Sequence, residues 1–130
     1  MDRVKKAIEN HDKGYNCAQA VLCAFSDKTN LSEDELFRIS EAFGGGMGGS
    51  GGVCGAVSGM VALAGIIKSK GIDYLPETAK KDSYACAKEM MDAFEKKNTT
   101  IICSKLKDGP IRTCDGCIED AVRILEEKIG

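Results

Sequence analysis

The chain has 130 residues, and its 18 Lys and Arg against 20 Asp and Glu give a net charge of −2 at pH 7. This length fits a single domain over residues 1–130 with its own core, and the lack of a basic excess argues against a nucleic-acid partner. The longest apolar run, 53–67, is shorter than the roughly 18 residues of a membrane span, and the charged stretch 1–13 does not resemble a secretory signal, so we expect a cytoplasmic protein.

Apolar residues recur at helical spacing through most of the chain, which predicts an all-α fold: a compact bundle of about five to six helices. The first helix is expected over about 2–12. Asn16 is expected to cap the second, and Ser32 with Glu35 forms a capping box for the third. A glycine-rich loop over 44–52 ends this third helix.

The fourth helix is expected from residue 52 or 53 to Lys70, with Gly71 as its C-cap. Because it is apolar on every side, it should lie in the middle of the bundle. A fifth helix is expected to carry Pro76 in its first turn. The remaining elements are a short turn over 101–109 and a last helix from about Cys114 to Lys128.

Seven cysteines are many for a chain of this size. Their number is odd and no export signal is visible, so a disulfide framework is not expected, and metal binding or redox chemistry is favoured. Cys23 and Cys86 fall within helices on apolar stripes and are assigned to the core.

Four cysteines are expected at helix N-termini: Cys17, Cys54, Cys103 and Cys114. There the unpaired backbone N–H groups and the helix dipole favour a thiolate and lower its pKa. The glycines before Cys54 leave room for the backbone to fold over a ligand, which makes Gly52, Val53 and Gly55 candidate cofactor-binding residues.

The stretch 114-CDGC-117 is a CxxC motif, in which two sulfurs can face one point as a redox dithiol or as half of a metal site. No second CxxC follows, so a zinc ribbon is not favoured. His11 is the single histidine, and its place near the end of the first helix indicates capping or surface exposure rather than catalysis.

The sequence resembles the C_GCAxxG_C_C family of redox-active proteins. The shared features are 14-GYNCAQAVL-22, 43-FGGGMG-48, 54-CGAVSG-59, Cys103, and Cys114 with 118-IEDAVRILE-126. The resemblance implies that Cys17, Cys54, Cys103 and Cys114 are the family's four cysteines and that Cys117 is an additional thiol. It also implies a redox role beside a redox partner protein.

Three functions are compatible with these residues. The first is an iron–sulfur centre for electron transfer or sensing, held by four of Cys17, Cys54, Cys103, Cys114 and Cys117. The second is a thiol–disulfide oxidoreductase in which Cys54 attacks and Cys17 or the pair Cys114 and Cys117 resolves the mixed disulfide. The third is a structural zinc site. Each of the three functions is compatible with a homodimer.

Overall fold

The computed structural model describes residues 2–108 and 111–129, and these residues form seven α-helices with short 3-10 turns between some of them. The helices are α1 (Arg3–Asp12), α2 (Cys17–Cys23), α3 (Glu33–Ser40), α4 (Gly55–Lys68), α5 (Lys80–Asn98), α6 (Cys103–Asp108) and α7 (Cys114–Ile129). The prediction of an all-α bundle is confirmed, and the short turn expected over 101–109 contains α6.

Two helices begin at the caps that the sequence predicts. The Asn16 side chain accepts a hydrogen bond from the Gln19 amide, and the Gln19 side chain accepts one from the Asn16 amide, both at 2.9 Å. Ser32 and Glu35 form the same reciprocal pair at the start of α3. Each box satisfies backbone donors that the helix leaves without a partner, so it fixes where α2 and α3 begin.

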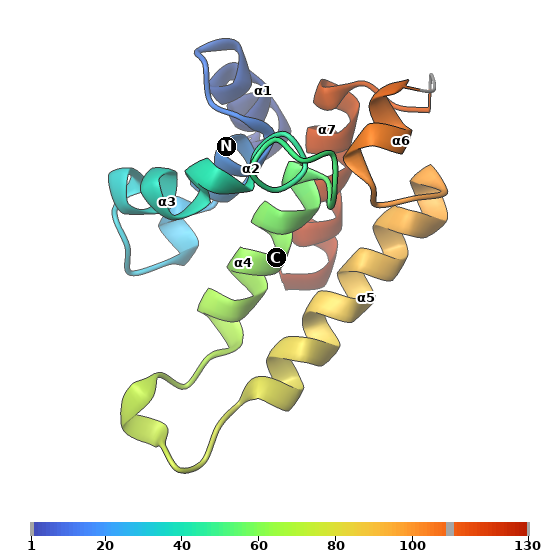
Figure 1. Cartoon of the computed structure of the whole chain (residues 1–130). Helices are drawn as coiled ribbons and strands as arrows, with labels where there is room; N and C mark the ends of the chain where they lie inside the picture. Colours follow the sequence, from blue (N-terminus) through green and yellow to red (C-terminus); the bar gives the residue numbers. More distant parts are fainter. Residues whose placement is uncertain (1, 109–110, 130) are drawn as a thin grey trace.

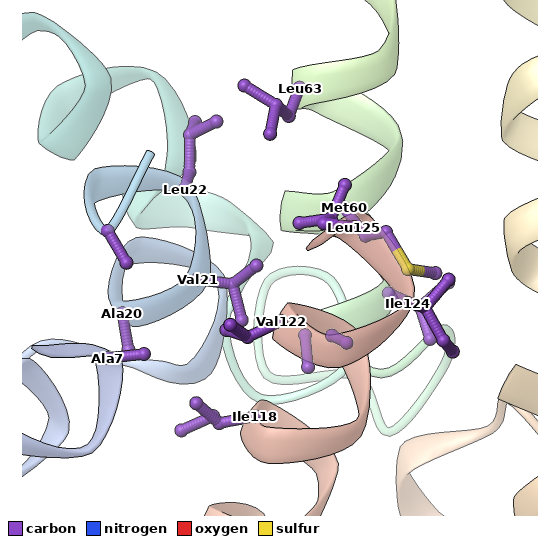
Figure 2. Close-up of a cluster of buried hydrophobic side chains, with 14 of the residues drawn as sticks. Ala7, Ala20, Val21, Leu22, Met60, Leu63, Ile118, Val122, Ile124 and Leu125 are labelled. Atoms are coloured by element: carbon purple, nitrogen blue, oxygen red, sulfur yellow. The ribbon is translucent and has the colours of Figure 1, made fainter. Parts of the chain in front are cut away.

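Helix α4 is the centre of the bundle, as its apolar sequence predicts. It packs against α2, α5 and α7, and Figure 1 shows α7 behind it and α5 along its side. Figure 2 shows the core that results, in which Met60 and Leu63 of α4 face Leu22 of α2 and Leu125 of α7. All four side chains are fully buried, so burial of apolar surface is the main force that holds these helices together.

Two glycines of α4 allow it to approach α2 closely. A Cβ atom at Gly59 would lie 2.7 Å from the Ala18 carbonyl oxygen, which no real side chain tolerates. One turn earlier, a Cβ at Gly55 would lie 3.2 Å from the Cβ of Cys17. The small residues therefore place the start of α4 beside the start of α2, and with it Cys54 near Cys17.

The boundaries of α4 and α5 differ from the prediction. α4 begins at Gly55 rather than at residue 52 or 53, because Val53 pairs with Ile102 in an antiparallel β-bridge that keeps it extended. It ends at Lys68 with Ser69 as its C-cap, so Gly71 is not the cap.

Pro76 does not open α5, which begins at Lys80. The side chains from residue 70 to 78 are exposed, so no burial favours a helix there. This connection projects from the body at the end opposite the glycine-rich loop (Figure 1). Of the helices in the described part of the chain, none has the length and apolar character that crossing a membrane would require.

Candidate functional site

Five cysteines line one small cavity, which we call the cysteine cavity. Its volume is about 20 Å³, room for about one water. It is lined by Cys17, Cys54, Cys103, Cys114 and Cys117 together with Gly45, Gly55, Leu106, Lys107 and Arg112. The five thiols come from the starts of α2, α4, α6 and α7, so segments nearly a hundred residues apart in sequence meet here.

Backbone pairing between two loops sets Cys54 beside Cys103. The Cys54 amide donates to the Ile101 carbonyl oxygen at 2.7 Å, and the Cys103 amide donates to the Gly52 carbonyl oxygen at 2.6 Å. The glycine-rich loop closes over this pairing: Gly46 has a φ of 77°, and a Cβ there would lie 2.7 Å from the Cβ of Cys103. Glycine is therefore needed at this position both for its backbone conformation and for space.

Cys54 occupies the N-cap position of α4, and its side chain makes no capping hydrogen bond there. The largest influence on its pKa is a hydrogen bond from the Cys117 thiol, and the nearby backbone N–H groups of Val57 and Ala56 also favour the thiolate. These donors, with the positive charge of Lys107, outweigh the cost of burying a charged sulfur and lower the pKa of Cys54 to about 7. Cys54 is thus substantially a thiolate at neutral pH.

The other cavity thiols with a resolved shift hold their protons more tightly. The pKa of Cys117 is raised, first because its thiol donates a hydrogen bond to Cys54 and then because the side chain is buried. Burial and the neighbouring Cys114 and Cys54 raise the pKa of Cys17 to about 12, and Cys17 also shares a hydrogen bond with Cys114. The thiols therefore form two hydrogen-bonded pairs, Cys54 with Cys117 and Cys17 with Cys114.

The remaining candidate residues lie around this centre. Gly55 is part of the cavity wall, whereas Gly52 and Val53 belong to the loop pairing behind it, where the Gly52 amide donates to the Gly46 carbonyl oxygen at 2.8 Å. His11 stands at the end of α1 with its Nδ1 atom 2.7 Å from an Asp115 carboxylate oxygen.

The two cysteines assigned to the core lie away from the cavity wall. Cys23 is buried, and its sulfur is 3.7 Å from the Glu33 carbonyl oxygen. Cys86 on α5 is half-buried and packs against the edge of the core. Its place on an apolar stripe is confirmed, although the stripe is not fully covered.

Sequence reasoning missed the two cations of the cavity wall, Lys107 and Arg112. Lys107 stands four residues after Cys103, so one helical turn would have placed both on the same face of α6. Arg112 precedes α7 by two residues and is brought over the cavity by a buried partner, Asp120. No local pattern in the sequence signals that contact.

The five cysteine sulfurs of the cavity are suitable ligands for a metal centre that thiolates hold. Soft thiolates are the ligands of iron–sulfur clusters and of zinc, and four are enough for either. Within residues 2–108 and 111–129, no three His, Cys, Asp or Glu side chains stand close enough to hold a single metal ion as arranged here.

The fold and the cavity define a helical, cysteine-rich protein of the redox class. Residues 15–128 match the model of a family described as "Putative redox-active protein (C_GCAxxG_C_C)". The chain belongs to this family, as its cysteine and glycine motifs predict.

One curated relative is an uncharacterized protein of Archaeoglobus fulgidus, 31% identical over 67 residues. The match covers 51% of this chain and 44% of the relative, so the chain accounts for less than half of the relative's length. No solved structure matches the chain.

Proposed function

We propose that this protein carries an iron–sulfur cluster in the cysteine cavity and uses it for electron transfer to a partner protein or for redox sensing. One observation supports the proposal above the rest: five cysteine side chains from four separate segments line a single cavity. Packing alone does not require sulfur from each of these segments, whereas a cluster requires four thiolates.

The ligands would be Cys17, Cys54, Cys103 and one of the CxxC residues, Cys114 or Cys117. When bound, the cluster supplies one-electron transfer. The chain contributes its charge balance, because Lys107 and Arg112 line the same wall and offset negative thiolates.

The cavity of about 20 Å³ is too small for several metal atoms, so holding a cluster would require the thiols to give up their mutual hydrogen bonds. The Ala56 and Val57 amides, which lie near enough to the Cys54 sulfur to lower its pKa, would be available to a ligand sulfur and would tune the potential.

The test is anaerobic purification from cells that build clusters, followed by an absorption spectrum and assays of iron and acid-labile sulfide. We expect brown protein with both elements, loss of both in Cys103→Ser, and their retention in Cys86→Ser, because Cys86 lies outside the cavity wall. Colourless wild-type protein that also fails to take up iron and sulfide on reconstitution would contradict the proposal.

A second candidate, thiol–disulfide exchange, is favoured by the hydrogen bond between Cys54 and Cys117. The Cys54 thiolate would attack a substrate disulfide, forming a mixed disulfide and releasing one substrate thiolate. Cys117 would then lose its proton and attack the Cys54 sulfur, which releases the second substrate thiolate. The two electrons come from the protein, which ends as a Cys54–Cys117 disulfide.

Reduced protein mixed with glutathione disulfide distinguishes this second candidate. Peptide mapping should find Cys54 joined to Cys117, and Cys117→Ser should accumulate glutathione on Cys54. A Cys114–Cys117 disulfide in place of that bond would exclude the mechanism, because it would show that the CxxC residues react with each other and not across the cavity.

A further inference from the structure

We propose that Lys107 and Arg112 make the cysteine cavity selective for negatively charged reactants, with Arg112 fixed in place by buried Asp120. The inference rests on the proposed redox function of this cavity and adds the charge of what reacts or binds there. Both cations belong to the cavity wall, and the described residues of that wall include no carboxylate.

Lys107 faces the cysteines from α6. It shares a hydrogen bond with Cys114, and the nearby Cys114 and Cys103 sulfurs raise its pKa, so it stays charged whenever the thiols react. Its side chain is otherwise exposed, which puts the ammonium group where an incoming molecule from solvent first meets the cavity. A strongly hydrated point charge on a flexible stem attracts anions without selecting their shape.

Arg112 is held much more rigidly. Its Nε and Nη2 atoms donate to the two carboxylate oxygens of Asp120 at 3.1 and 3.2 Å. Asp120 is only 1% exposed, and it also accepts from Lys97 at 3.0 Å and from Asn98 at 3.1 Å. Such a two-pronged contact between a guanidinium and a carboxylate fixes both groups in one plane.

The charges around Asp120 leave a positive balance. Asp120 carries one negative charge, whereas Arg112 and Lys97 together carry two positive ones. Glu119 stands 3.9 Å from Arg112, but Arg123 pairs with its carboxylate at 2.9 Å and offsets its negative charge. Burying the Asp120 carboxylate therefore anchors the guanidinium at the cavity without cancelling the local positive potential.

Gly116 in the CxxC motif makes room for this arrangement. A Cβ atom at Gly116 would lie 2.5 Å from Arg112 Nε and 2.7 Å from Arg112 Cζ. The guanidinium thus lies directly on the backbone of the turn that joins Cys114 to Cys117. The glycine has a specific purpose here, which is to let a fixed cation lie against the first turn of α7.

Two alkylating reagents of similar size but different charge test the inference: neutral iodoacetamide and anionic iodoacetate. The reduced full chain is alkylated at low ionic strength, and mass spectrometry gives the rate at each cysteine. The ratio of the iodoacetate rate to the iodoacetamide rate reports the local potential and cancels differences in exposure between sites. Lys105→Gln on α6 and Lys128→Gln on α7 are matched controls, since both residues are exposed and neither lines the cavity.

We expect Lys107→Gln and Arg112→Gln each to lower this ratio at Cys17 and Cys114 by about threefold, and the difference to shrink in about 0.5 M salt. Arg112→Lys should keep most of the wild-type ratio, which a merely structural role for Arg112 would not predict. The ratio at Cys86, which lies outside the cavity wall, should not change, and neither should the ratios at Cys17 and Cys114 in both controls.

Wild-type ratios in Lys107→Gln and Arg112→Gln would overturn the inference, as would an equal loss in the two controls. If Arg112→Gln fails to fold, Lys107→Gln and Arg112→Lys still decide the outcome. The assay needs neither iron nor turnover. A protein that binds no cluster would contradict the proposed iron–sulfur centre, whereas the alkylation ratios alone decide the present inference.

Discussion

The Cys54 sulfur at the start of α4 accepts a hydrogen bond from the Cys117 thiol in the first turn of α7. This contact joins the two halves of the site, since the chain between them runs through α4, α5 and α6. It also gives the two buried sulfurs different protonation states: Cys54 carries the negative charge, and Cys117 holds the proton. The lower pKa of Cys54 is therefore set by this contact and not by exposure.

Removing the Cys117 donor should raise the pKa of Cys54. In metal-free, reduced protein, the alkylation rate of Cys54 should reach half its maximum at a pH of about 7. In Cys117→Ala the midpoint should move up by about one pH unit, because a buried thiolate has lost a hydrogen bond. Cys117→Ser supplies an O–H donor in place of S–H and should stay near the wild-type midpoint; equal profiles for all three proteins would refute the assigned contact.

The close approach of α2 and α4 predicts opposite effects for two Gly→Ala substitutions in one helix. Gly59→Ala should lower the free energy of unfolding by about 1–3 kcal/mol, because the new methyl group meets the Ala18 carbonyl oxygen. Gly65→Ala meets nothing within 4 Å and should raise it by about 0.5–1 kcal/mol through helix propensity. Urea unfolding of both variants checks this, and a stabilised Gly59→Ala would show that the helices lie farther apart.

Asp120 should be the most important single charge for stability. Asp120→Ala leaves Arg112 and Lys97 without their buried partner and should cost about 3 kcal/mol in urea unfolding. Asp34→Ala removes an exposed ion pair with Arg38 and should cost at most about 0.5 kcal/mol.

The contribution of Asp120 to the free energy of unfolding should also fall as the pH becomes acidic. Arg112, Lys97 and Asn98 outweigh burial and lower the pKa of Asp120 below that of the unfolded chain. Its contribution is therefore complete above the unfolded value of about 4 and is lost as the pH falls through the folded value. Measured against Asp120→Asn, the wild-type advantage should shrink in acid; an advantage that grows in acid would contradict the ion pairs.

Alkaline pH should weaken the metal-free fold through its buried thiols. Burial is the first cause that raises the pKa of Cys23 to about 12, so this group stays protonated in the folded chain after it ionises in the unfolded one. The corresponding stability is complete below the unfolded value of about 8.5 and is lost as the pH rises towards 12. Cys23→Ala should lose stability less steeply between pH 8 and about 10 in urea unfolding, and an identical slope would argue that Cys23 is accessible.

Sequence reasoning reached furthest where the signal is local. The capping residues Asn16 and Ser32 fixed helix starts correctly, and the all-round apolar character of 55–68 indicated the central helix. In the same way, helix-start positions singled out Cys17, Cys54, Cys103 and Cys114, which the structure places around one cavity. Each of these features depends on a few neighbouring residues.

The features that were missed depend on contacts between distant segments. The β-bridge between Val53 and Ile102 moves the start of α4 to a later residue, and no residue near Val53 indicates a partner 49 positions later in the chain. Cys117 lies in the cavity as fully as Cys114 does because the first turn of α7 turns both residues inward. The space beside Gly116 is filled by Arg112, a contact that the CxxC motif does not predict.

The central claim is that these cysteines converge on one redox centre, and anomalous X-ray scattering at the iron edge tests it most directly. Crystals of anaerobically purified protein should show iron density surrounded by the sulfurs of Cys17, Cys54, Cys103 and a CxxC residue. Iron bound elsewhere, or these sulfurs lying on different sides of the molecule, would contradict the account.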